Sequence, residues 1–580
     1  MRDLRATIIT KIADAIGNLS SLGRFILGAL IVLFVVAVVW LVCDVSASFL
    51  VTVPMNGGTV TLGIVGKPRL INPVLAVSVP DKDMDALVYS GLTRWDIKEQ
   101  KLIPDLAESW AISPDDTVYT FILKTGLTFQ DGTPLTADDI LFTVNAIQNP
   151  ALHSPLAANW AGVTAKKIDA HTVQFILPAP YAPFIENTSV GILPAHTWQK
   201  IPAEQFATAA SNTRPIGSGP FAIGGITGPA NNPSAYALTP FVHFSLGTPH
   251  LGRLVVHFFS DTETAATAAE NHQIDELSNV SPDQITPLQQ RGFFINEFSL
   301  PRVFGIFFNQ TNSSVLADPA VRQALNTAVD RTAIVANVFG NSALAISGPI
   351  PPAFLPTSAP DSSVPAPANS TLAENILDKA GWIVNNDGIR EKKKTIGTTT
   401  LSFAIATAPA PELVATANLL ANRWQAIGVN VSVKVFDSGF EDQVIEPRNY
   451  DALFFGQDIG RGLDLYPFWA SSETADPGLN IALYKNKSVD ALLGDMRTTA
   501  SSTVRQADIA AFNADFARDL PAIMLYEQNL SVGRTETIHG DSVGPIANIS
   551  ERLSDAYRWY AQTEEIWSVF APKTATASYQ

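Results

Sequence analysis

The chain has 580 residues, more than a single ordinary core holds and enough for two or three lobes. Charged residues make up 16% of the chain, hydrophobic residues 46%, and the formal net charge is −16. This acidic balance argues against nucleic-acid binding, which needs clustered Lys and Arg. The one basic run, residues 390–394, contains a Glu and is interpreted as a solvated hairpin tip.

Cysteine usage is minimal. With Cys43 alone, the chain can form neither an intramolecular disulfide nor a Cys-based zinc site.

The N-terminal region contains an unbroken apolar run, residues 25–43, FILGALIVLFVVAVVWLVC, which is long enough to cross a bilayer as a helix. Basic residues precede it and Asp44 follows, so residues 1–24 are expected in the cytoplasm and the rest outside, after a spacer at residues 44–58. Cleavage near Val45-Ser46-Ala47 is the alternative, and lipidation of Cys43 is another. The length of the run favours an uncleaved anchor.

The next elements follow local signals. Residues 59–65 alternate as a strand does. Residues 102–147 predict a short helix, a turn, two strands, a tight turn at Asp131-Gly132 and a helix that Thr136 and Asp139 cap. Residues 171–177 predict a further strand.

A glycine-rich turn occupies residues 215–221, PIGSGPF. The two glycines predict a tight backbone path that a larger residue could not follow. A nucleophile elbow is disfavoured, because that motif needs G-x-S-x-G before a helix and Pro220 blocks helix continuation.

The second half alternates helices and strands. Residues 302–309 predict a buried strand, and Asp318-Pro319 begins a helix that stops at Gly340. We interpret Arg322 and the Asp330-Arg331 pair as helix-surface charges. Residues 351–370 predict a loop, 372–382 and 411–428 helices, and 429–435 and 449–456 strands, so the chain is of α/β class. No catalytic, phosphate-binding or metal motif is recognisable, and no cofactor is expected.

Several phrases occur in a characteristic order. They are PDLAESW, YTFILKTGLTFQDGTPLTADD, PIGSGPF, VRQALNTAVDRTAIV and LAENILDKAGW. Through these phrases and their order, the chain resembles the family 5 extracellular solute-binding proteins, the peptide and nickel receptors of ABC importers.

The resemblance implies a two-lobed periplasmic-binding-protein-like fold of class II, with an extra subdomain, behind one transmembrane helix. Residues 59–98, 211–302 and 530–570 would form lobe I, and residues 99–210 its extra subdomain. Residues 303–529 would form lobe II, and residues 571–580 a tail.

The resemblance also implies a cleft whose solute is held by lobe closure. Asp464 fits the acidic position that pairs with a peptide amino terminus in relatives, and Asp458 is the second choice. A turn Asp capping its own backbone is the plain alternative. Tyr466, Phe468 and Trp469 would wall the cleft or pack in the core. Residues 404–413 contain no Arg or Lys, which leaves longer peptides or an uncharged solute.

The expected function is therefore a membrane-anchored receptor without enzymatic activity. It would bind oligopeptides or a similar solute and deliver them to separate permease and ATPase subunits. A peptide sensor or scavenging receptor that acts without transport is the alternative, and an exported hydrolase is a weaker third.

Overall fold

The computed structural model describes residue 11 and residues 17–47, 49–229, 232–340, 342–355, 365–499 and 501–570. The chain divides into two compact units, Met1–Asn56 with Gln562–Gln580 and Gly57–Ala561. The predicted tail, most of the cytoplasmic segment and part of the predicted loop at residues 351–370 lie outside the described residues.

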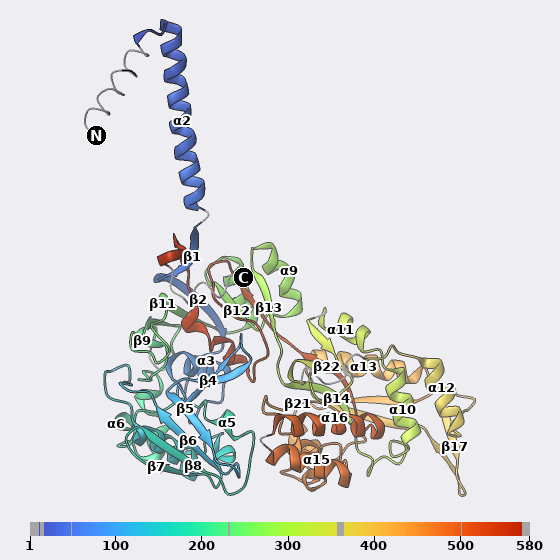
Figure 1. The fold of residues 1–580 in the computed structure, drawn as a ribbon. Coiled ribbons are helices and arrows are strands. Elements are labelled where there is room, and N and C mark those ends of the chain that lie inside the picture. Colours follow the sequence, from blue (N-terminus) through green and yellow to red (C-terminus); the bar gives the residue numbers. More distant parts are fainter. Residues whose placement is uncertain are drawn as a thin grey trace. The chain divides into compact units, whose positions relative to one another are not determined.

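The smaller unit contains an exposed apolar helix, α2 (Ser21–Ala47), followed by a strand (Figure 1). Within the part of the chain that the structure describes, Ser21–Leu41 is the helix long and apolar enough to cross a membrane. Strand β1 (Leu50–Met55) pairs antiparallel with β24 (Gln562–Trp567). The predicted spacer therefore contains a strand, and its partner comes from the C-terminal stretch assigned to lobe I. A ladder between segments about 500 residues apart leaves no local signal.

Lobe I of the larger unit is built on a mixed sheet. Strand β2 lies inside it, parallel to the strands on either side, which confirms the strand predicted at residues 59–65. The strand order is β13 (Phe294–Phe298), β23 (Leu530–Arg534), β12 (Glu276–Ser278), β2 (Gly57–Val65), β11 (Leu251–Phe259), β10 (Ala235–Pro240) and β9 (Phe221–Thr227). Its helices are α3 (Val79–Val88), α8 (Thr262–Glu270) and α9 (Pro282–Gln290).

The extra subdomain shares a continuous hydrophobic core with lobe I. Its sheet has the order β5 (Ala107–Ile112), β6 (Val118–Leu123), β8 (Thr172–Ile176) and β7 (Thr164–Lys167), all antiparallel. The predicted capped helix is α4 (Ala137–Gln148), with the expected capping box between Thr136 and Asp139. Short helices follow as α5 (Phe184–Asn187), α6 (Ala195–Trp198) and α7 (Ala203–Phe206).

The short helix predicted after residue 102 is wrong. The chain there forms β4 (Lys101–Pro104), paired with β3 (Thr93–Asp96), and then β5, paired with β6. Pairing with strands on either side overrides the weak helical preference of a stretch this short.

Lobe II contains a sheet that is covered on both faces. The strand order is β15 (Ala343–Ala345), β22 (Ala522–Gln528), β14 (Arg302–Phe308), β21 (Ala452–Asp458), β19 (Ser402–Thr407) and β20 (Asn430–Val435). Ile523 and Leu525 face the core formed with α10 (Pro319–Ala328), α11 (Arg331–Phe339), α12 (Ser370–Lys379) and α13 (Pro411–Gln425). Ala522 and Met524 face the core formed with α14 (Tyr466–Trp469), α15 (Lys487–Thr498) and α16 (Ser502–Asp519). Successive strand residues point to opposite faces, so one strand serves both cores.

The helix predicted from Asp318 to Gly340 is two helices. Val329 takes an extended conformation after α10, and the Asp330 side chain accepts the backbone N–H of Ala333 to begin α11. The surface assignment of Arg322 and Arg331 is also wrong. Both are buried and donate to backbone carbonyls, Arg322 to Asp519 at 2.9 Å and Arg331 to Met524 at 2.7 Å. These two carbonyls lie almost 200 residues away along the chain, so helical spacing did not reveal them.

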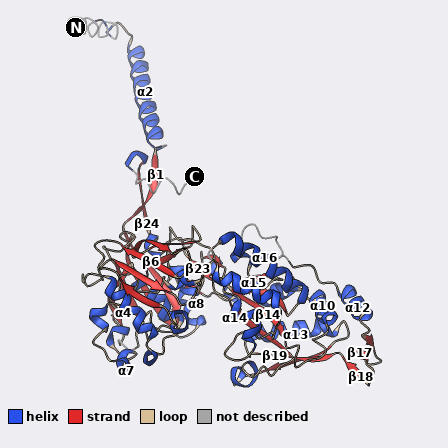
Figure 2. Cartoon of the chain, turned by 60° about the horizontal axis from the view of Figure 1, so that its bottom comes forward, coloured by secondary structure: helices blue, strands red, loops and turns tan. Residues whose placement is uncertain are grey.

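The basic run also departs from expectation at its first residue. It belongs to the sheet β16 (Ile383–Val384), β17 (Arg390–Lys393) and β18 (Thr398–Thr400), drawn at the edge of lobe II in Figure 2. Lys393 and Lys394 are exposed as predicted, but Arg390 is buried and donates to the carbonyl of Ile427.

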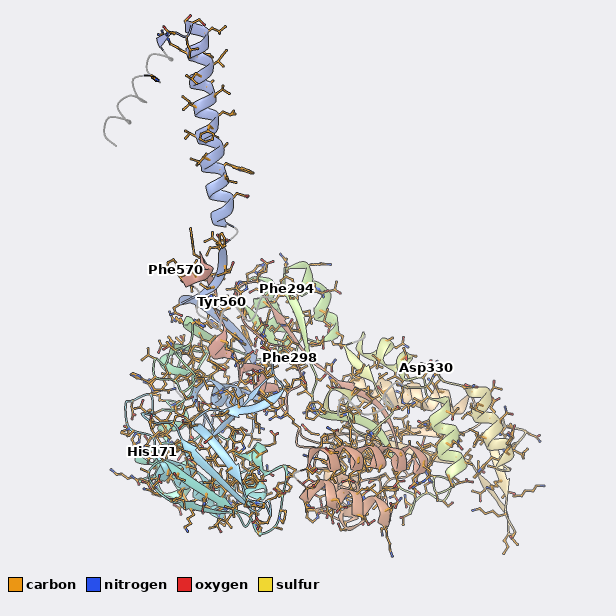
Figure 3. The ribbon with its side chains drawn as sticks, viewed as in Figure 1. His171, Phe294, Phe298, Asp330, Tyr560 and Phe570 are labelled. Atoms are coloured by element: carbon orange, nitrogen blue, oxygen red, sulfur yellow. The ribbon has the colours of Figure 1, made fainter. Side chains whose placement is uncertain are left out.

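The chain passes between the two lobe sheets twice. One passage is residues 299–301, after Phe298 at the end of β13 (Figure 3), and the other is Asn529, between β22 and β23. Short connections of this kind let two sheets rotate without breaking either ladder.

Candidate functional site

Asp464 lies between β21 and α14 at a contact between lobe II and the extra subdomain. Its side chain is only 15% exposed and pairs with Arg497 at 3.0 Å. The Tyr181 hydroxyl of the extra subdomain donates to the same carboxylate oxygen at 3.1 Å. Burial, followed by the charge of Asp464, raises the pKa of Tyr181 well above its ordinary value. The carboxylate chosen from the sequence is therefore already paired with a cation in this conformation.

Arg497, on α15 of lobe II, also contacts the extra subdomain. Its guanidinium lies 4.8 Å from the ring centroid of Tyr466 and 5.5 Å from that of Tyr181. The backbone carbonyl of Arg497 accepts the N–H of Ala182 at 2.9 Å. An aromatic pair and a carboxylate around one cation form a compact polar cluster, which we call the Asp464 cluster: Tyr181, Asp464, Tyr466 and Arg497.

Arg461 makes a second contact between the lobes. It donates to Glu186 of the extra subdomain and, at 2.6 Å, to Glu551 of lobe I. Its guanidinium also stacks on Trp95, 3.8 Å from the ring centroid. Burial alone would lower the pKa of Arg461, but Glu551 and Glu186 together raise it. Two carboxylates on one buried guanidinium make strong charge-assisted hydrogen bonds.

A cavity of about 300 Å³ lies beside this second contact. All of its lining residues belong to lobe I or the extra subdomain, and they include the three partners of Arg461, namely Trp95, Glu186 and Glu551. Helix α3 supplies one wall and residues 186–191 another. A space of this size bounded by aromatic and polar side chains is typical of small-ligand sites.

The other predicted site residues lie in different surroundings. Asp458 is half exposed and 3.5 Å from Arg302 on the neighbouring strand. Tyr466 belongs to the Asp464 cluster, and Phe468 is half-buried against the core of lobe II. Trp469 is fully buried, with its ring 5.0 Å from that of Phe516 and 5.9 Å from that of Phe307. In this conformation Trp469 therefore packs in the core and does not line a cleft.

The sequence reading missed Arg461 and its partners. Arg461 is the only basic residue between Phe454 and Trp469, a segment read for its acidic residues. Glu186 and Glu551 lie 275 and 90 residues away along the chain. The local sequence shows only that Arg461 is a single basic residue in this segment, and it does not indicate that Glu186 and Glu551 are its partners. Among the described residues, no group of His, Cys, Asp or Glu is arranged to hold a metal ion.

Residues 101–477 match the model of the bacterial extracellular solute-binding proteins, family 5. The chain belongs to this family. The match covers more than half of the chain and includes the extra subdomain, both Asp464 and Arg461, and most of lobe II.

Two curated proteins are identical to this family 5 protein at about a quarter of the aligned residues. The oligopeptide-binding protein AppA of Bacillus subtilis is 27% identical over 514 residues, 85% of this chain and 90% of AppA. Protein XP55 of Streptomyces lividans is 28% identical over 475 residues, 78% of this chain and 81% of its own.

Solved structures show the same two-lobed fold. NikZ from Campylobacter jejuni, in complex with Ni(L-His), has a TM-score of 0.66 at 25% identity and covers 87% of this chain and 99% of its own. AppA from Bacillus subtilis, in complex with a nonapeptide, has a TM-score of 0.64 at 24% identity and covers 88% of this chain and 100% of its own. Family and fold therefore agree with the resemblance seen in the motifs.

Proposed function

We propose that this protein is the substrate-binding subunit of an ABC importer and that it binds oligopeptides between its lobes. The supporting observation is its membership of a solute-binding family, together with 27% identity, over 85% of the chain, to a protein named for oligopeptide binding. The protein itself would carry out no chemistry, and separate permease and ATPase subunits would complete the importer.

The lobe contacts suggest how a solute would be held. Arg461 and the Asp464 cluster join lobe II to lobe I and its extra subdomain, so separating the lobes would break both. Separation would free the Asp464 carboxylate from Tyr181, and a peptide ammonium could then pair with it as the lobes close again. Arg497 lies in lobe II with Asp464 and stays paired with it, so a peptide ammonium would take the place of the Tyr181 hydroxyl and share the carboxylate with Arg497.

The same geometry bears on peptide length. Residues 404–413, which include the end of β19 and the start of α13, contain no Arg or Lys. A short peptide would find no cation there for its carboxyl terminus. Longer peptides, held through main-chain hydrogen bonds, fit better.

The N-terminal helix would hold the receptor at the membrane. Its composition and length suit a signal anchor, with Arg24 on the cytoplasmic side and the lobes outside. An anchored receptor stays close to its permease without a lipid on Cys43.

Native mass spectrometry of the full chain in detergent tests the proposed function. We expect co-purifying peptides of mixed sequence, released on denaturation. A single metal chelate or sugar as the bound species would overturn the peptide assignment.

The role of Asp464 is tested with a peptide so identified. Asp464→Asn should weaken binding of the peptide with a free amino terminus, and should leave its N-acetylated form nearly unchanged. Asp458→Asn, at the half-exposed second choice, is the matched control. Equal affinity of the wild type and Asp464→Asn for the free-amine peptide would refute the role.

A further inference from the structure

The cavity beside Arg461 contains polar atoms that the fold leaves without partners. They are Oδ1 of Asp85, the hydroxyl of Tyr89 and Oγ of Ser554. Tyr89 is 3% exposed and Ser554 7%, and all three residues line the cavity. None of these atoms has a hydrogen-bond partner within the described part of the chain. A buried polar atom left unpaired destabilises the folded state, so native proteins retain few of them.

The three residues come from two elements that the fold brings together. Asp85 and Tyr89 lie one turn apart, on α3 and at its C-terminal end, and therefore share a face. Ser554 follows the turn at residues 549–553, which packs against α3. Gly191 allows the opposite wall to approach, because a Cβ there would lie 2.6 Å from Cβ of Tyr89.

The charges around the cavity leave one carboxyl group without a close counter-ion. Asp105 is paired with Arg94 at 2.7 Å, and Glu186 and Glu551 are paired with Arg461. Asp85 has only the longer-range charge of Lys82, while burial and the nearby Asp81 raise its pKa well above the ordinary value. A cation entering the cavity would restore the ionised form of Asp85.

The remaining walls suit an aliphatic stem. Trp160, Leu156, Val190 and Ala86 line the same space. A lysine side chain buries its methylene groups against such surfaces and offers three N–H donors at its end. Three acceptors, the carboxyl of Asp85 and the hydroxyl oxygens of Tyr89 and Ser554, match the three donors of an ammonium group.

We propose that this cavity binds the ammonium group of a lysine side chain of the peptide, so that the receptor prefers peptides with a lysine. The inference rests on the proposed function and deepens it. Access comes from the lobe contact, since Trp95, Glu186 and Glu551 line the cavity and also contact Arg461 of lobe II. When the lobes close, Arg461 sits beside the bound side chain and neutralises the two glutamates, which leaves Asp85 to the ammonium.

The test uses the full-length protein in detergent and isothermal titration calorimetry. The probes are five alanine-based pentapeptides with lysine at each position in turn. Two matched series carry norleucine or Nε-acetyl-lysine in its place, so length and apolar surface are kept while the charge is removed. We expect at least tenfold tighter binding of the best lysine peptide than of both its matched forms.

Protein variants then locate the effect. Asp85→Asn should abolish the lysine preference and leave the affinity for the norleucine peptide within twofold. Tyr89→Phe should reduce the preference by a smaller factor, and Glu204→Gln, exposed on α7, should not change it. The acetyl-lysine comparison needs no variant and remains decisive if Asp85→Asn does not fold.

Failure of the inference and failure of the proposed function give different results. If all three peptide series bind equally, or if Asp85→Asn keeps the lysine preference, the cavity assignment is wrong and peptide binding stands. If no peptide in any series binds and none co-purifies, both are wrong.

Discussion

Gly219 lies where the glycine-rich turn passes the end of α3. Its N–H donates to the carbonyl of Val88 at 2.8 Å, and a Cβ on Gly219 would lie 2.5 Å from the carbonyl carbon of the same residue. Gln130, from the tight turn before α4, donates to the carbonyls of Val88, Gly219 and Phe221. The turn therefore joins lobe I to the extra subdomain through the backbone, which explains why its glycines are needed.

A methyl group at this position should be poorly tolerated. We expect Gly219→Ala to lower the free energy of unfolding by about 1–3 kcal/mol, because either the turn or the end of α3 must move. Thermal unfolding measured by circular dichroism checks this. Gly494→Ala, on α15 with no atom within 4 Å of the added Cβ, should instead be neutral or stabilising by up to about 1 kcal/mol. Equal effects of the two changes would contradict the close approach.

Glu527 is a fully buried carboxyl group on β22, next to the second passage between the lobes. Burial raises its pKa from 4.5 to about 7, against a smaller lowering by the Ser299 side chain. The folded state therefore keeps a proton that the unfolded chain has lost between these two pH values. The contribution of Glu527 to the free energy of unfolding is therefore fully present below pH 4.5 and is lost as the pH rises through 7.

Replacing Glu527 by glutamine should remove that pH dependence. Between pH 4.5 and pH 8, the free energy of unfolding should fall by about 3 kcal/mol more in the wild type than in Glu527→Gln. This follows from the 1.36 kcal/mol that one pKa unit represents. Urea denaturation at several pH values measures the difference. Glu263→Gln, on the exposed start of α8, should follow the wild type. Parallel curves for wild type and Glu527→Gln would show that Glu527 titrates normally.

The segment between β21 and α14 is the element that joins the lobes. Arg461 and Asp464 lie three residues apart in this segment and contact different partners. Arg461 donates to Glu186 and Glu551. Asp464 accepts the hydroxyl of Tyr181. Truncating one member of a buried ion pair leaves the other charges without a partner, which costs several kcal/mol where they remain buried. Opening the lobes relieves this cost by exposing the glutamates to water.

Arg461→Gln should therefore favour separated lobes in the absence of ligand. Spin labels on His171→Cys and Lys393→Cys, in a chain whose single native cysteine is replaced by Cys43→Ser, report the distance between the extra subdomain and lobe II. We expect a longer and broader distance distribution for Arg461→Gln than for the parent. Arg302→Gln, which loses only a half-exposed pair within lobe II, is the control. An unchanged distribution would show that other contacts hold the lobes.

At the scale of the whole molecule, an apolar helix precedes a large acidic body. If α2 remains as an anchor, the protein should sediment with membranes, resist alkaline carbonate and dissolve only in detergent. Intact mass spectrometry should give the full 580-residue chain, and Cys43→Ala should stay membrane-bound. A mature chain beginning at Ser48, or a diacylglyceryl group on Cys43, would contradict the anchor.

Local patterns predicted much of this fold. The capping box of α4, strand β2, the start of α10 and the helix at α13 all follow from side chains within a few residues of one another. Most errors occurred where a distant segment decided the outcome, as in the β4–β5 region and the pairing of β1 with β24, whereas the break at Val329 is set locally by the Asp330 cap. Hydrogen-bond ladders and packing between such segments outweigh the small differences in local propensity.

The sequence by itself determined the family, through its motifs and their order, and the apolar N-terminal helix, because both are properties of contiguous residues. Only the tertiary structure decided which charges meet. It paired Asp464 with Arg497 and Tyr181, and Arg461 with Glu186 and Glu551, and it gathered Asp85, Tyr89 and Ser554 around one cavity. These groups come from segments tens to hundreds of residues apart, and the energy of a buried charge depends on neighbours that folding alone supplies.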